Sequence, residues 1–142
     1  MVFKCDYHLV WVPKYRYRIL TGDVAKRVDR DIRQLSEFLE CEVIELNVQA
    51  DHVHAVVSIP PKVPVSQYMV TIKGKMAIRL FKSYPMLRQK PYWGNHFWAR
   101  GYFVNTVGVD EDLIRRYVKF QEGEELREEQ DRKGFSQADL GI

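Results

Sequence analysis

Two histidines separated by one residue, His52 and His54, are the part of the sequence most suited to chemistry. They lie in a Val-rich run from Asp51 to Ile59 that is followed by Pro60, which is typical of a β-strand. Side chains alternate between the two faces of a strand, so both imidazoles are expected on one face, and an apolar row is expected on the other face, namely Val53, Ala55, Val57 and Ile59. Imidazole nitrogens are common metal ligands, and this pair could supply two ligands of a metal site. The alternative is a pair of surface histidines on a half-buried strand.

A metal site needs at least one more ligand, and the last predicted helix offers a candidate. Tyr117 and Gln121 are one turn apart on the apolar side of a helix predicted from Asp110 to Gly123. Burying an amide without a partner costs a few kcal/mol, so Gln121 could instead complete the site through its carbonyl oxygen. Two nitrogens and one oxygen with open positions suit Mg²⁺ or Mn²⁺ and do not exclude Zn²⁺.

A divalent cation at this place would favour phosphodiester chemistry. All its protein ligands would be neutral, so the ion would keep its charge and could stabilise negative charge building on a phosphate. The phenol of Tyr117 has an ordinary pKa of about 10 and attacks poorly until it loses its proton, which a neighbouring cation favours. Its attack would leave a phosphotyrosine that conserves the bond energy and allows rejoining. The alternative for a tyrosine on an apolar stripe is a place in the core.

Hydrophobic periodicity predicts the elements that must position these residues. Alternation predicts strands over 3–12, 42–49, 51–59 and 97–106, and helical spacing predicts helices over 21–40, 65–84 and 110–123. The order βαββαβα indicates one four-stranded antiparallel sheet with helices on a face, an α+β fold of the ferredoxin-like or RRM-like type. Gly74 costs the second helix about 1 kcal/mol relative to Ala, which predicts a packing or close-approach reason for it.

Composition indicates a single domain with a sizeable core, since 46% of the 142 residues are hydrophobic. No apolar run is long enough to span a bilayer, and the N-terminus has no secretion signal. Cys5 and Cys41 lack the spacing of metal or redox motifs, so we expect reduced thiols in a cytoplasmic protein, with a disulfide between them left open.

The net charge of +3 is unevenly distributed. Residues 123–142 hold six acidic and three basic residues, so this acidic C-terminal tail carries −3 and the domain of residues 1–122 carries +6. A basic body favours a polyanionic partner. The residues expected to contact DNA are basic side chains and one interleaved tyrosine: Lys14, Tyr15, Arg16, Arg18, Lys73, Arg79 and Arg100. The alternative for them is an ordinary solvated loop and helix surface.

Four separated blocks of the sequence resemble the single-tyrosine transposases of small insertion sequences, the TnpA type of HUH endonuclease, which includes the REP-associated tyrosine transposases. The blocks are YHLVWVPKYR at 7–16, DHVH at 51–54, FWARGYF at 97–103 and YVKFQ at 117–121. Residues 52–54 have the histidine–hydrophobe–histidine form of that superfamily. The resemblance runs from about Phe3 to Gln121 in matching order and spacing, and only the acidic tail is uncovered.

The resemblance implies a DNA transposase that cleaves and rejoins single-stranded DNA at insertion-sequence ends. It implies that His52, His54 and Gln121 bind a divalent metal, Mg²⁺ or Mn²⁺. Tyr117 would attack a DNA phosphate and leave a 5′-phosphotyrosine and a free 3′-hydroxyl. Similar proteins act as homodimers that recognise DNA hairpins, and in some the tyrosine helix serves the histidine pair of the other subunit. Related two-tyrosine enzymes often carry a second tyrosine four residues away, where this chain has Leu113 and Gln121.

Three other functions stay open as alternatives. A histidine-based nucleotide hydrolase would need a third histidine where the chain has Val56. A non-catalytic RRM-like module would display aromatic residues on two central strands, and only the first strand offers them, as Tyr7 and Trp11. A domesticated relative would bind and nick hairpins without mobilising an element. We interpret His8 as an ordinary strand histidine, and Asp51 as a turn residue or a partner of a ligand histidine.

Overall fold

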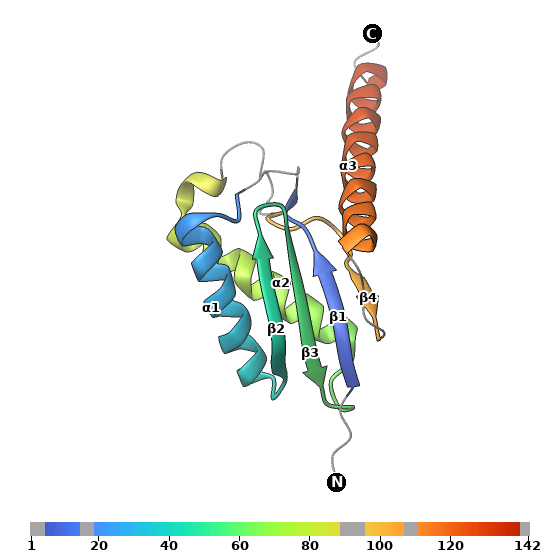
Figure 1. Ribbon diagram of the computed structural model, residues 1–142. Coiled ribbons are helices and arrows are strands. Elements are labelled where there is room, and N and C mark those ends of the chain that lie inside the picture. The colour runs from blue at the N-terminus through green and yellow to red at the C-terminus, as the bar shows by residue number, and fades with distance from the viewer. Residues whose placement is uncertain (1–4, 15–18, 89–95, 107–110, 140–142) are drawn as a thin grey trace.

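The chain folds into one antiparallel sheet with two helices packed on one side and a third helix that leaves it (Figure 1). The computed structural model describes residues 5–14, 19–88, 96–106 and 111–139. In chain order the elements are β1 (Cys5–Trp11), α1 (Gly22–Phe38), β2 (Glu42–Gln49), β3 (His52–Ile59), α2 (Val65–Ser83), the 3₁₀ helix η2 (Pro85–Arg88), β4 (Phe103–Asn105) and α3 (Glu111–Asp139). This order confirms the predicted βαββαβα arrangement and the α+β class.

The sheet has the strand order β2-β3-β1-β4, so the two central strands are β3 and β1. Both are antiparallel to their neighbours, and Leu9 of β1 lies opposite Ala55 of β3. Antiparallel partners directly opposite each other project from the same face, so this register fixes which residues share a face.

One face of the sheet packs on α1 and α2 and forms the main core. Leu9, Trp11, Val53, Ala55 and Val57 are fully buried on this face. The helices add apolar stripes, namely Val28, Ile32 and Leu35 from α1, and Tyr68, Met69, Ile72, Met76 and Leu80 from α2. The predicted apolar row on the histidine strand is therefore confirmed, and its burial directs the alternate residues of β3 to the other face.

The second face of the sheet is partly covered by the start of α3. Val10 and Val56 project from this face and are nearly inaccessible, yet they lie outside the main core cluster. Ile114 near the start of α3 is also buried, and the rings of Phe103 and Tyr117 meet edge to face with centroids 5.8 Å apart. These contacts attach α3 to the β4 side of the sheet. We call this second surface the histidine face, because His52 and His54 project from it.

The fourth strand is shorter than the sequence predicted. β4 spans Phe103–Asn105, so the prediction of a strand over 97–106 is wrong in its extent. Gly101 adopts a φ of 84°, a left-handed backbone that interrupts the extended run and that glycine tolerates without strain. Before it, the chain meets the segment after β1 through an isolated bridge between Pro13 and Trp98. Two backbone bonds accompany the bridge, from the Ala99 N–H to the Val12 carbonyl at 2.9 Å and from the Lys14 N–H to the Phe97 carbonyl at 2.8 Å.

The last helix does not end at Gly123 as predicted but continues to Asp139. One glycine costs a helix interior only about 1 kcal/mol, and good helix formers on both sides outweigh it. An ion pair between Glu124 and Arg127 spans the next turn. The acidic segment that begins at Gly123 is thus, as far as Asp139, the distal part of α3, and Figure 1 shows it projecting beyond the sheet. Within the described ranges, neither this helix nor any other has an apolar stretch that could cross a bilayer.

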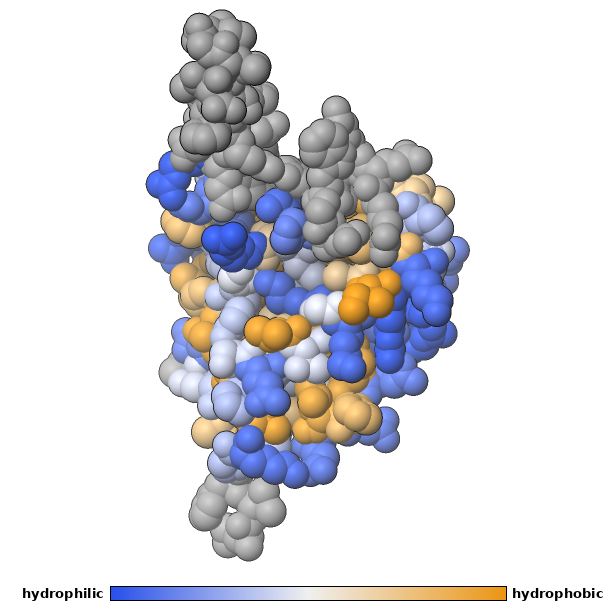
Figure 2. Space-filling view, turned by 180° about the vertical axis from the view of Figure 1, so that it is seen from behind, coloured by the Kyte–Doolittle hydropathy of each residue, from blue (hydrophilic) through white to orange (hydrophobic). Residues whose placement is uncertain are grey.

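The outer side of α2 carries exposed apolar side chains beside the exposed lysines Lys75 and Lys82. Val70 and Ile78 are the exposed apolar residues there, at 72% and 67% accessible. Among the described residues, no atom lies within 4 Å of a Cβ added at Gly74, so the structure shows no packing reason for this glycine, and a close approach stays a prediction. Figure 2 views the molecule from behind and shows hydrophilic residues interspersed with separate hydrophobic patches.

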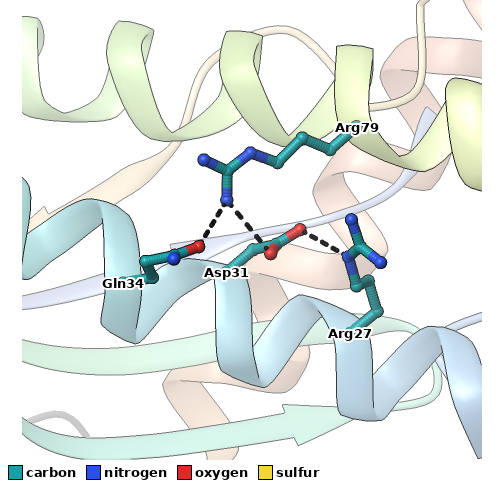
Figure 3. A network of polar contacts seen from close by, with 4 residues as sticks. All are labelled: Arg27, Asp31, Gln34 and Arg79. Carbon is teal, nitrogen blue, oxygen red and sulfur yellow. Dashed lines mark hydrogen bonds and ion pairs between the residues drawn. The ribbon is translucent and has the colours of Figure 1, made fainter.

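A buried carboxylate joins α1 to α2 (Figure 3). Asp31 is 1% exposed and accepts hydrogen bonds from Arg27 on its own helix at 3.3 Å and from Arg79 on α2 at 3.2 Å. Arg79 also donates to the Gln34 side chain at 2.9 Å. A buried charge is tolerated only when it is paired and hydrogen-bonded, and here two cations fill that role. This network fixes the packing of the two helices that support the sheet.

We predict that Asp31→Asn lowers the free energy of unfolding by about 2 to 3 kcal/mol, because both charge-assisted bonds weaken and two arginines lose their shared partner. Urea denaturation followed by circular dichroism measures the change. Asp29→Asn is the matched control, since Asp29 pairs with Arg33 on the exposed side of the same helix, and that change should cost less than about 1 kcal/mol. Equal effects of the two substitutions would contradict the assignment.

Candidate active site

The two histidines of the β3 strand lie on one face, as predicted. Their neighbours Val53 and Ala55 are fully buried in the main core, so alternation directs His52 and His54 to the histidine face, where both are half-buried. The strand is central in the sheet and is paired on both sides. Pairing on both sides fixes the backbone positions from which the two imidazoles project.

The orientation of His52 is set by its neighbour in sequence. The Nδ1 atom of His52 lies 2.9 Å from a carboxylate oxygen of Asp51. A carboxylate can only accept, so Nδ1 carries a proton, and in the neutral form of the ring Nε2 keeps its lone pair. Of the two interpretations of Asp51, the structure therefore favours a partner of a ligand histidine over a turn residue alone.

His54 has a polar atom that the protein leaves without a partner. Its Nε2 is buried and makes no hydrogen bond. Burial lowers the pKa of His54, electrostatic interactions with His8 and His52 lower it further, and the nearby Glu45 carboxylate opposes the shift. The imidazole is therefore held neutral at neutral pH, which is the form that can bind a metal.

His8 is the residue of this site that sequence reasoning missed. Its ring centroid lies 5.8 Å from that of His54, and its Nδ1 is buried without a hydrogen bond. On β1, Val10 lies opposite His54 and His8 lies opposite Val56, so the register carries His8 onto the histidine face. The alternation of β1 places His8 on the same face as Val10. It indicates a place beside His54 only once β1 and β3 are known to be paired.

Tyr117 reaches the same face from α3. Its ring packs on Phe103, and its hydroxyl is buried without a hydrogen bond of normal geometry. Burial raises the pKa of Tyr117 to about 12, and the nearby Gln121 side chain opposes that shift. The phenol is therefore protonated at neutral pH and needs activation before it can act as a nucleophile.

The register defines how the tyrosine lies relative to the histidine pair. Phe103, Val10 and His54 form one row across β4, β1 and β3, and Tyr117 packs on the Phe103 end of that row. Two strand spacings of about 5 Å each separate Phe103 from His54. The structure thus brings Tyr117 and the histidines to one face, with β1 between them.

The donor set suits a metal ion that takes few ligands from the protein. Among the described residues, no three His, Cys, Asp or Glu side chains are placed to hold a metal. The two imidazoles offer nitrogen ligands, and a further ligand would have to be an amide such as Gln121 or an oxygen of a bound substrate. Gln121 follows Tyr117 by one turn of α3 and is half-buried.

The basic residues predicted to contact DNA divide into distinct groups. Arg79 is engaged by Asp31 and Gln34, and Lys73 donates hydrogen bonds of 2.8 Å each to the carbonyls of Ala99 and Gly101. Burial lowers the pKa of Lys73 to about 8. Both side chains therefore hold the fold together, while Arg100 is exposed.

The predicted DNA contacts before α1 are described only in part. Lys14 is half-buried, and its N–H donates to the Phe97 carbonyl at 2.8 Å. Tyr15, Arg16 and Arg18 lie outside the described residues. The DNA contacts at all seven positions stay a prediction.

We predict that Lys73→Met destabilises the fold by about 1 to 3 kcal/mol, because two carbonyls of the segment leading to β4 lose their donor. Chemical denaturation measures this change. Lys75→Met is the matched control, since Lys75 is exposed on the same helix and should tolerate the substitution within about 0.5 kcal/mol. The idea that Lys73 holds this segment would fail if both variants unfolded at the same denaturant concentration.

Comparison with known proteins gives one consistent family. A family model described as "Transposase IS200 like" matches residues 1–121. The transposase for insertion sequence element IS200 of Salmonella typhimurium is 38% identical over 128 residues, which cover 90% of this chain and 84% of that protein. The ISDra2 transposase TnpA of Deinococcus radiodurans is 34% identical over 125 residues, which cover 87% of this chain and 89% of that protein.

Two solved structures resemble the fold. A crystal structure assigned to a transposase from Deinococcus radiodurans superposes with a TM-score of 0.75 at 31% identity and covers 85% of this chain and 93% of that one. A REP-associated tyrosine transposase bound to a REP hairpin gives a TM-score of 0.54 at 15% identity, covering 83% of this chain and 65% of that one. The second likeness is one of fold alone.

Proposed function

The chain belongs to the IS200-like transposase family, and we propose that it cleaves and rejoins single-stranded DNA at insertion-sequence ends. The family match confirms the resemblance to TnpA-type HUH transposases. One observation carries the proposed chemistry: the His54 Nε2 is buried without a partner on the face of the sheet that the Tyr117 hydroxyl, with Gln121 beside it, also reaches. Buried polar atoms are nearly always paired, so an unpaired imidazole nitrogen on the same face as a tyrosine and an amide supports a ligand site.

The proposed metal ligands are His52, His54 and Gln121. Asp51 leaves the Nε2 of His52 available, His54 is neutral with a free Nε2, and Gln121 adds a neutral oxygen from α3. This set fits Mg²⁺ or Mn²⁺, which accept open positions filled by water and phosphate oxygens. When bound, the ion would polarise the scissile phosphodiester and stabilise the charge that develops on it.

The proposed nucleophile is the Tyr117 oxygen. It attacks the phosphorus and loses its proton, the bond between phosphorus and the 3′-oxygen breaks, and that oxygen leaves with the electron pair and takes up a proton. The products are a 5′-phosphotyrosine and a free 3′-hydroxyl. Rejoining is the reverse step, in which a 3′-hydroxyl attacks the phosphotyrosine. No energy source is needed because the number of phosphodiester linkages is conserved.

We further propose that the chain acts as a homodimer on DNA hairpins in the cytoplasm. Phe120 and Leu126 support a dimer, because they are large apolar side chains exposed on α3, the helix that projects from the sheet. The β1 strand between Tyr117 and His54 is compatible with a tyrosine that serves either its own histidine pair or the partner's. Cys5 and Cys41 are not joined by a disulfide, which agrees with a reducing compartment.

The RRM-like alternative is disfavoured because the aromatic side chains of β1 point into the main core. Tyr7 packs against the main core and Trp11 is fully buried there, so neither is available for stacking on bases. β3 contributes no aromatic residue other than its histidines. A domesticated nickase would use the same site, and it differs only in whether an element is mobilised.

We predict that Tyr117→Phe abolishes a covalent protein–DNA adduct while it leaves DNA binding within about twofold, because only the reacting oxygen is removed. The protein is incubated with Mn²⁺ and labelled single-stranded hairpins from the DNA flanking its gene, and the adduct is resolved on a denaturing gel. Cleavage by the variant at the parent's rate would refute Tyr117 as the nucleophile.

The same gel tests the proposed metal ligands. His52→Ala and His54→Ala should each lose metal-dependent cleavage, by about 100-fold or more, because each removes one of two nitrogen ligands. His96→Ala is the control, since His96 is exposed and away from β3 in sequence. Undiminished cleavage by the two ligand variants would favour a site elsewhere.

A charge-removal series tests the DNA-binding segment. Replacing Lys14, Arg16 and Arg18 by Gln should weaken binding and reduce the slope of log affinity against log salt by about 2, because three phosphate contacts are lost. A control with Lys26, Lys75 and Lys82 changed to Gln removes the same charge from exposed positions on α1 and α2. Binding measured by fluorescence anisotropy over a salt series would contradict the assignment if both triple variants behaved alike.

A further inference from the structure

We propose that His8 is a further DNA-contacting residue of this site, whose imidazole donates a hydrogen bond to a phosphate lying between the histidine pair and Tyr117. The inference rests on the proposed function, because that function places a phosphate on the histidine face. It adds a residue that neither the metal set nor the nucleophile accounts for.

The position of His8 in the sheet is the first argument. β1 lies between β3, which carries His54, and β4, on which Tyr117 packs through Phe103. A phosphate that is attacked by this tyrosine while it is held near this histidine pair must lie over β1. On the histidine face of β1, the side chains nearest that path are Val10 and His8. Val10 is fully buried and apolar, so His8 is the polar group available there.

The contact between His8 and the phosphate is also possible if the partner subunit supplies the tyrosine. His8 and His54 come from one chain, and their ring centroids are 5.8 Å apart. A phosphate oxygen close to the His54 Nε2 is then within the reach of a neighbouring imidazole, whichever copy provides the nucleophile. The proposal therefore does not depend on how α3 is shared in a dimer.

The missing hydrogen bond of His8 is the second argument. Its Nδ1 is buried without a partner, whereas the Nδ1 of His52 is fixed by Asp51. An unpaired buried polar atom destabilises the folded state, so a histidine with only a structural role is expected to have a partner. A ring left without one can turn to whichever nitrogen meets a bound phosphate. A neutral imidazole has one N–H to donate, so the contact requires no change of charge.

DNA affinity in a protein that cannot cleave tests this contact. In a Tyr117→Phe background with Mn²⁺, fluorescence anisotropy measures binding of the labelled single-stranded hairpin. His8→Phe keeps a ring but removes both nitrogens and should weaken binding about 10- to 100-fold, the size of a hydrogen bond to a charged group. His8→Asn or His8→Gln, which place an amide donor near one ring nitrogen or the other, should restore most of the affinity. His96→Phe is the control for the same chemical change at an exposed position.

A second measurement separates DNA contact from metal binding and from folding. Mn²⁺ affinity without DNA, read by electron paramagnetic resonance, should stay within about twofold in His8→Phe. Parallel loss of Mn²⁺ affinity would make His8 a metal ligand and overturn the proposal, as would unchanged DNA affinity or a loss that neither amide variant restores. If His8→Phe does not fold, His8→Leu replaces it in the same comparison with the amide variants.

The two proposals fail in different ways. If the protein with Tyr117 intact forms no adduct with any divalent metal, the phosphotyrosine chemistry is wrong. A loss of DNA affinity in His8→Phe that the amide variants restore would still establish the His8 contact in that case. Conversely, a normal adduct rate in His8→Phe with Tyr117 intact would overturn the role of His8 and leave the proposed function in place.

Discussion

The antiparallel pairing of β1 with β3 is the constraint on which the rest of the structure depends. Because side chains alternate along a strand, one register decides at once which residues form the core and which form the site. The pairing of Leu9 with Ala55 directs the apolar rows toward α1 and α2, and the pairing of Val10 with His54 directs the histidines to the opposite face. A slip of one residue would exchange the two sets, so burial of the core also fixes the geometry of the histidine face.

Burial on that face keeps His54 and Tyr117 uncharged at neutral pH. Burial lowers the pKa of His54 and raises that of Tyr117 to about 12, so a neutral imidazole and a neutral phenol lie on one surface. Neither effect comes from an ion pair, because the dominant cause in both is loss of water. A cation and a phosphate would supply the missing charges together. The unpaired nitrogen of His54 and the protonated Tyr117 hydroxyl on the same face are thus consistent with the proposed metal and phosphate site.

The charged residues of α2 show how the helices and the segment before β4 support the candidate site. Arg79 and Asp31 join the two helices, and Lys73 holds the carbonyls of Ala99 and Gly101 just before β4. Since β4 carries Phe103, on which Tyr117 packs, the Lys73 contact lies on the structural route to the proposed nucleophile. Sequence alone assigned both cations to DNA, because composition gives the sign of a charge but not its partner. In the structure, Arg79 is paired with the buried Asp31 carboxylate and Lys73 with two backbone carbonyls, so both cations stabilise the fold.

The sequence by itself determined the βαββαβα order, the apolar row of β3 and the placement of His52 and His54 on one face, because these follow from local periodicity. The tertiary structure decided what depends on distant neighbours. It placed His8 beside His54, because strand pairing is not local. It shortened β4 at Gly101 and carried α3 through Gly123, because backbone strain and the helix propensity of flanking residues set where an element ends. It also placed Tyr117 across β1 from His54, because only the sheet order relates the last helix to the third strand.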